Sequence, residues 1–102
     1  MGEKMPISAV SHYRGGTIDR VMPLAKRQKA VLLKYGVLYR LSRFETGPNA
    51  GDWLVVVQYP DRAAYDKAQE SFAQDPEYQQ VATEIAEFAT RISRELVIDL
   101  DL

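Results

Sequence analysis

Two runs rich in branched and aromatic residues, separated by a short turn, constrain the fold of this 102-residue chain more than any other feature. The runs are residues 37–46 (VLYRLSRFET) and 52–59 (DWLVVVQY), and residues 47–51 between them read GPNAG. Branched and aromatic residues favour strands, whereas Gly, Pro and Asn supply turn chemistry. The pattern therefore predicts an antiparallel hairpin in the middle of the chain, around which the other elements must be arranged.

The residues before the hairpin predict a strand and then a helix. Residues 7–14 (ISAVSHYR) form a short strand pattern that ends at two consecutive glycines. Residues 17–35 carry apolar side chains at helical spacing, with Thr17 as the N-terminal cap and Gly36 as the stop. Because Pro23 cannot donate a backbone hydrogen bond, we expect the helix to kink there or to begin near it.

The residues after the hairpin predict a pair of helices and a final strand. Asp61 is expected to cap the first helix, and Asp-Pro-Glu at 75–77 opens the second with a cap, a proline and an acid. The second helix is marked by a clean apolar stripe of Tyr78, Val81, Ala82, Ile85, Ala89 and Ile92. Residues 96–102 alternate with a period of two, which predicts a strand starting at Leu96.

The predicted order is strand, helix, strand, strand, helix pair, strand. This order is typical of the ferredoxin-like β-α-β-β-α-β arrangement, in which an antiparallel sheet carries its helices on one face. We therefore predict an α+β fold with a single domain over residues 6–102 and a flexible N-terminus at 1–5. The other face of the sheet must be polar or covered by a partner.

Alternation along the strands separates two faces. The mostly apolar set, assigned to the helix side, is Ile7, Ala9, Tyr13, Val37, Tyr39, Leu41, Trp53, Val55, Val57, Tyr59, Leu96, Ile98 and Leu100. The mixed set is Val10, His12, Arg14, Leu38, Arg40, Phe44, Leu54, Val56 and Gln58. A sheet face that is partly apolar and partly polar is typical of a face covered by a second sheet, so we predict a homodimer. A β-bulge in any strand would invert its assignment beyond that point.

Composition excludes several classes of function. The chain has no cysteine and one histidine, so it predicts no disulfide, no metal site and no cofactor. No apolar run is long enough to span a bilayer and the N-terminus lacks a secretory core, so we expect a cytoplasmic protein without membrane contact. Basic residues of the first helix lack interleaved aromatics, so we expect no nucleic-acid partner.

His12 is the first candidate for chemistry, because an imidazole can act as a general base or a ligand. The predicted sheet brings it to one end, together with Arg14, Arg43, Phe44 and Trp53. No carboxylate lies near His12 in the sequence to orient its ring, so the interpretation we favour is a hydrogen-bonding group between two sheets. The alternative, a working site at this end of the sheet, stays open.

Two further polar residues fall inside the predicted sheet and helix. Arg40 is expected to pair with a carboxylate in a dimer, with an anionic ligand as the alternative. Gln28 is the lone polar residue on the inner stripe of the first helix, opposite Tyr39 and Tyr59. A buried amide must find partners, so Gln28 either bonds a tyrosine hydroxyl or lines a pocket.

A family resemblance rests on residues 53–81, where a strand leads into a D-x-x-A-Y helix start at Asp61 and a D-P-E-Y-Q helix start at Asp75. This segment resembles the dimeric α/β-barrel superfamily, which includes cofactor-free antibiotic-biosynthesis monooxygenases and small families of unknown function. The resemblance implies two sheets packed back to back, with ligands held between each sheet and its helices. Its motifs are structural, so they do not indicate which reaction the protein would catalyse.

Three hypotheses about function follow. The first is a homodimeric binding or accessory domain for a small aromatic ligand, held among Gln28, Tyr39, Trp53, Tyr59 and Tyr65. The second is a cofactor-free monooxygenase or isomerase acting on a phenolic or quinone-like substrate, with His12 or a tyrosine moving a proton. The third is a dimerisation module without a ligand. A pocket that reaches a titratable group would favour the second, and a tight core the third.

Overall fold

The fold is known from a computed structural model, which describes residues 5–100. The N-terminal segment expected to be flexible, residues 1–5, lies outside this range except for its last residue. The elements are β1 (Ile7–Arg14), α1 (Ile18–Lys34), β2 (Leu38–Arg43), β3 (Trp53–Tyr59), α2 (Arg62–Gln74), α3 (Pro76–Ala86) and β4 (Thr90–Ile98). The strands form one antiparallel sheet in the order β2-β3-β1-β4. The predicted α+β, ferredoxin-like fold is confirmed.

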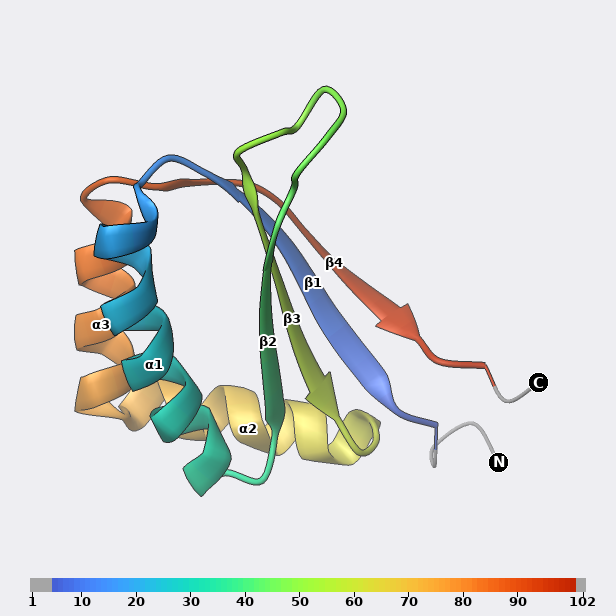
Figure 1. The fold of residues 1–102 in the computed structure, drawn as a ribbon. Helices are drawn as coiled ribbons and strands as arrows, with labels where there is room; N and C mark the ends of the chain where they lie inside the picture. The colour runs from blue at the N-terminus through green and yellow to red at the C-terminus, as the bar shows by residue number, and fades with distance from the viewer. Residues whose placement is uncertain (1–4, 101–102) are drawn as a thin grey trace.

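The three helices pack against one face of the sheet, with α1 and α3 side by side (Figure 1). The core between them contains Ile7, Ala9, Leu32, Val37, Tyr59, Ala68 and Phe72. Ile7 pairs with both Tyr59 and Ile98, so the odd positions of β1 and β3 and the even positions at the end of β4 share the helix side. The predicted separation of the two faces is thereby confirmed for these strands.

The opposite face of the sheet, which we call the open face, carries no helix (Figure 1). Val10 pairs with Val56 at its centre, and Leu54 lies beside His12 across β1 and β3. Strand β4 lies at the edge of the sheet, and every one of its residues is exposed. The open face and β4 thus leave apolar surface without a partner among the described residues.

A β-bulge in β4 changes which residues face the helices. Ser11 pairs with Arg94, but the register shifts after His12 so that Tyr13 pairs with Arg91. Because one residue is added on the β4 side, Arg91 and Arg94 both share the face of Ser11 and Tyr13. The position of this bulge was not predicted from the sequence.

Local capping explains where the helices begin. Thr17 Oγ1 accepts a hydrogen bond from the backbone N–H of Arg20, and the carboxylates of Asp61 and Asp75 each accept one from the N–H three residues later. All three caps were predicted. Helix α1 already begins at Ile18 and runs through Pro23, so Pro23 does not mark its start.

The predicted end of α3 is wrong. The apolar stripe to Ile92 suggested a longer helix, but α3 ends at Ala86 and β4 begins at Thr90 rather than at Leu96. Residues 90–94 pair with the second half of β1, and these sheet hydrogen bonds override the helical period. The connection also passes close to the β1–α1 turn. A Cβ atom on Gly15, which has a φ of 111°, would lie 2.3 Å from the Phe88 carbonyl oxygen.

Opposite charges join α1 to α3. Arg27 places Nη2 3.0 Å from Glu77 Oε1 and Nη1 3.0 Å from Glu84 Oε2. The basic first helix and the acidic third helix therefore complement each other. Such half-exposed pairs contribute little to stability, so the packing of apolar side chains dominates.

Candidate functional site

A divided cavity lies between the sheet and the helices. Its first hollow, of about 80 Å³, is mostly apolar and is lined by Tyr13, Val21, Ala25, Gln28, Tyr39, Leu41, Trp53, Val55, Ile85, Phe88 and Ala89. A second hollow of about 80 Å³ shares Tyr13, Gln28, Tyr39 and Val55 with the first. It continues past polar side chains, which include Ser11, Tyr59, Gln69, Tyr78, Arg91 and Arg94. The two hollows adjoin at their shared residues.

Gln28 lies where the two hollows meet. Its Oε1 atom is buried and has no hydrogen-bond partner among the described residues. Gln28 lines both hollows, and no hydrogen bond joins its amide to a tyrosine hydroxyl among residues 5–100. A buried acceptor without a partner destabilises a protein by roughly 1–3 kcal/mol. A ligand that carries a hydrogen-bond donor could relieve that cost.

Two tyrosines of the cavity, Tyr39 and Tyr59, are protonated at neutral pH. Burial raises the pKa of Tyr39 to about 12, and burial likewise raises the pKa of Tyr59 to about 12. Tyr59 also accepts a hydrogen bond of 3.2 Å from Gln69 Nε2. Tyr65 packs edge-on against Tyr59 at 5.0 Å between ring centroids and is not among the residues that line the two hollows. Phenols in this state donate hydrogen bonds but are poor bases.

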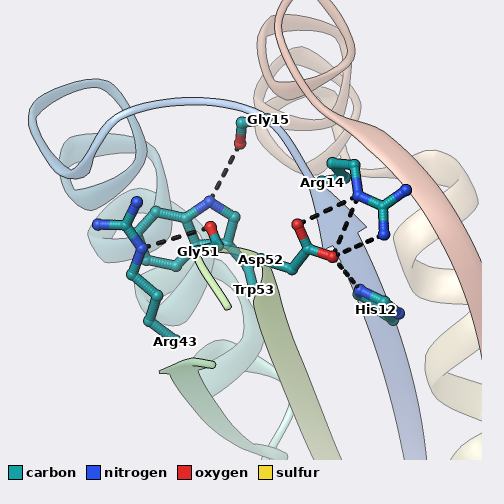
Figure 2. Close-up of polar contacts among 7 residues, drawn as sticks. All are labelled: His12, Arg14, Gly15, Arg43, Gly51, Asp52 and Trp53. Carbon is teal, nitrogen blue, oxygen red and sulfur yellow. Dashed lines mark hydrogen bonds and ion pairs between the residues drawn. The ribbon is translucent and has the colours of Figure 1, made fainter. Parts of the chain in front are cut away.

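Trp53 is part of the lining of the first hollow. Its side chain is 5% exposed, and its Nε1 donates a 3.0 Å hydrogen bond to the carbonyl of Gly15 (Figure 2). The guanidinium of Arg43 lies 4.7 Å from the centroid of the indole ring. These contacts hold the ring in one orientation, so Trp53 forms a fixed wall of the cavity.

A second polar cluster lies at the same end of the sheet but on its open face. His12 Nε2 lies 2.7 Å from Asp52 Oδ2, and Arg14 Nη2 lies 3.0 Å from the same oxygen (Figure 2). Hydrogen bonds from Arg14, and then from His12, lower the pKa of Asp52 below its usual range. His12 also packs against Phe44, with ring centroids 5.3 Å apart.

The expectation that His12 lacks an orienting carboxylate is wrong. Asp52 directly precedes Trp53, so extending the β1–β3 register by one residue places it opposite Arg14. This signal was present in the sequence, although Asp52 lies 40 residues from His12. The predicted meeting of His12 with Trp53 does not occur as a shared site. Tyr13 pairs with Trp53 and His12 pairs with Leu54, so the two side chains lie on opposite faces.

Arg40 occupies the other end of the open face. It lines a hollow of about 320 Å³, and the other lining residues are Ser8, Leu38, Tyr39, Val56, Gln58 and Asp99. No carboxylate among residues 5–100 forms an ion pair with Arg40. The predicted pairing of Arg40 across a dimer stays a prediction.

Between residues 5 and 100, no group of three or more His, Asp or Glu side chains could hold a metal ion. In the same range, no helix is both long enough and apolar enough to cross a membrane.

Comparison with known proteins identifies the fold. The sequence matches no protein-family model and no curated protein. Among solved structures, SnoaB, a cofactor-independent oxygenase from Streptomyces nogalater, superposes with a TM-score of 0.71 at 13% identity, covering 96% of each chain. A protein of unknown function from Bacteroides thetaiotaomicron, described as a possible oxidoreductase, superposes with a TM-score of 0.68 at 17% identity, covering 94% of this chain and 99% of the other.

A third structure relates the fold to an assembly. A dimeric protein of unknown function with a ferredoxin-like fold, from Bacteroides fragilis, superposes with a TM-score of 0.57 at 11% identity, covering 92% of this chain and 94% of the other. The ferredoxin-like fold that the resemblance implied is thus confirmed. At these identities the likeness shows architecture alone, so function must be argued from the site.

Proposed function

We propose that the protein binds a small, single-ring aromatic molecule in the cavity between its sheet and helices. The observation that carries the proposal is Gln28, whose buried Oε1 lacks a partner at the point where two hollows meet. Each hollow measures about 80 Å³. An apolar cavity of about 150 Å³ can hold benzene, so the two together suit one ring better than a fused system.

Binding accounts for this cavity better than catalysis does. Its lining contains aromatic and aliphatic walls with a few polar groups, which is the usual composition of a small-molecule site. Tyr39 and Tyr59 are held in the protonated form, so they can orient a ligand but would remove a proton poorly. His12 lies on the opposite face of the sheet and cannot reach a ligand in the cavity.

Phenol is a suitable probe, because it joins one ring to one hydrogen-bond donor. Trp53 is the only tryptophan, so its single indole N–H signal in an NMR titration reports on the cavity wall. We expect a saturable shift of that signal. Ala25→Leu should fill the first hollow and abolish the shift, since Ala25 is buried and lines it. Ala30→Leu, the same change at an exposed position of α1, is the matched control.

The titration can contradict the proposal in two ways. The first is a titration in which phenol produces no saturable shift, and the second is one in which Ala25→Leu binds phenol as well as the unaltered protein does. Circular dichroism on both variants establishes that they remain folded, so that a loss of binding is attributed to the cavity.

We also propose that the protein acts as a homodimer that packs through the open face. The support is the apolar surface on that face, where Leu38 is 60% exposed. A specific dimer should bury at least ~1,200 Å² in total. Light scattering should give twice 11.6 kDa for the unaltered protein, and a mass near 11.6 kDa for Leu38→Lys. Leu33→Lys, at a 54% exposed leucine of α1, should stay dimeric. A monomeric unaltered protein would exclude the proposal.

A second candidate, a cofactor-free monooxygenase or isomerase for a phenolic or quinone-like substrate, is favoured by the His12–Asp52 pair. A carboxylate bonded to one ring nitrogen orients an imidazole for proton transfer. The substrate would then have to bind on the open face, next to Phe44. Oxygen uptake with a hydroquinone that is lost in both His12→Ala and Asp52→Asn would support this candidate. Uptake equal to that of buffer would exclude the monooxygenase.

A further inference from the structure

Two arginines lie at the polar end of the cavity because of the bulge in β4. Arg94 pairs with Ser11 and Arg91 pairs with Tyr13, so both side chains are on the helix side of the sheet and both line the second hollow. In a strand without a bulge, two residues three apart would point to opposite faces. The bulge therefore concentrates two positive charges at one rim of the cavity.

These charges are not neutralised locally. Neither Arg91 nor Arg94 forms an ion pair with a carboxylate among residues 5–100. Arg94 Nη2 donates a 3.0 Å hydrogen bond to the Tyr65 hydroxyl, which is not a carboxylate. None of the described residues that line the two hollows is an Asp or a Glu. Burial raises the pKa of Tyr78, which lines the second hollow. The charges of Arg94 and Arg91 lower that pKa by a smaller amount, so their electrostatic effect extends into the hollow.

The chemistry of a guanidinium selects the complementary ligand group. Arginine presents planar N–H donors that match a carboxylate, and such charge-assisted bonds are stronger than neutral ones. Arg91 and Arg94 are exposed at the rim, where a carboxylate can arrive without complete loss of its hydration. The apolar first hollow, by contrast, offers nothing that would stabilise an anion.

We infer that the ligand of this cavity is a single-ring aromatic acid, with its ring among the shared residues of the two hollows and its carboxylate at Arg91 and Arg94. A ring hydroxyl or amine would donate to Gln28. The inference rests on the proposed function, because it names the chemical class of the molecule that the cavity binds. It adds a requirement, a negative charge, that binding of an aromatic ring alone does not include.

The test compares two probes that differ in charge and hardly in shape, para-hydroxybenzoate and para-hydroxybenzamide. Calorimetry on the unaltered protein should show that the acid binds at least about tenfold more tightly than the amide. The double variant Arg91→Gln/Arg94→Gln should lose this preference and keep its affinity for the amide. Arg40→Gln, which removes the same charge from the open face, should retain the preference.

The outcomes separate the inference from the proposed function. Equal affinities for the two probes, with the Trp53 indole signal shifting in both titrations, would overturn the aromatic-acid inference and leave the cavity as a binding site. A preference that survives in the double variant would also overturn it. Absence of binding by either probe, and by phenol, would overturn the inference together with the proposed function. The probe comparison needs only the unaltered protein, so it does not depend on the variants folding.

Discussion

Asp52 Oδ2 accepts a hydrogen bond from Arg14 Nη2 and lies 2.7 Å from His12 Nε2. The carboxylate is 8% exposed, so its charge is satisfied almost entirely by these two side chains. Asp52 directly follows the hairpin turn, whereas His12 and Arg14 lie in the last three residues of β1, an inner strand of the sheet. The cluster therefore connects the hairpin turn to β1. This position makes it a contributor to stability whether or not it carries chemistry.

Asp52→Asn should lower stability at neutral pH and flatten its dependence on pH. Arg14 and His12 keep the pKa of Asp52 lower in the folded chain than in the unfolded one. The stability that Asp52 contributes is therefore fully present above the unfolded value, 3.8, and is lost as pH falls through the folded value. Urea midpoints measured from neutral to acidic pH should converge for the two proteins.

The control for this prediction is Asp66→Asn, the same change at a 64% exposed carboxylate of α2. Its pH profile should match that of the unaltered protein. A profile for Asp52→Asn that parallels the unaltered one over the whole acidic range would show that the Asp52 cluster does not stabilise the fold.

His12→Ala should reduce stability and leave ligand binding in the cavity unchanged. The variant loses one hydrogen bond to Asp52 and the packing of the imidazole against Phe44. The hydrogen bond alone is worth about 1 kcal/mol. Phenol titration followed by the Trp53 indole signal, together with urea unfolding, measures both effects on one protein. Loss of phenol binding with an unchanged urea midpoint would instead place the binding site at this end of the sheet.

Asp75→Ala should destabilise the protein more than Asp61→Ala does. Each residue caps a helix, and loss of a cap at Asp61 costs about 0.5–2 kcal/mol. Asp75 is also buried and accepts hydrogen bonds from the Tyr35 hydroxyl and from Lys34 Nζ. These groups would lose their partner in the variant. Equal urea midpoints for the two variants would mean that Asp75 acts only as a cap.

Gln28→Leu should raise stability and weaken the binding of phenol. Removing an unsatisfied buried acceptor stabilises the fold by about 1 kcal/mol, while the ligand hydroxyl loses the atom that would accept its proton. Toluene, which lacks the hydroxyl, should bind both proteins equally. Gln69→Leu removes an amide that is bonded to Tyr59, so it should lower the urea midpoint. A lower midpoint for Gln28→Leu would indicate that its amide is satisfied in solution.

Local sequence predicted the elements well where one signal dominated and poorly where two competed. The caps at Thr17, Asp61 and Asp75 were placed correctly, because a cap depends on a few neighbouring residues. The boundary between α3 and β4 was misplaced, because Ile92 continues a helical stripe while the residues on either side of it, Arg91 and Ser93, pair with β1. Pairing with a strand distant in the sequence is a tertiary interaction, and the spacing of apolar residues within one segment cannot predict it.

The sequence by itself determined the order of the elements, the faces of the strands and the nearness of Gln28 to Tyr39, since these follow from periodicity and from the hairpin turn. Only the tertiary structure decided the partners of the charged groups. Asp52 meets His12 through the register between β1 and β3, and Arg91 joins Arg94 at the cavity through a one-residue bulge. Register and bulges are set by packing across strands that lie far apart in the chain, so the pattern within one strand cannot specify them.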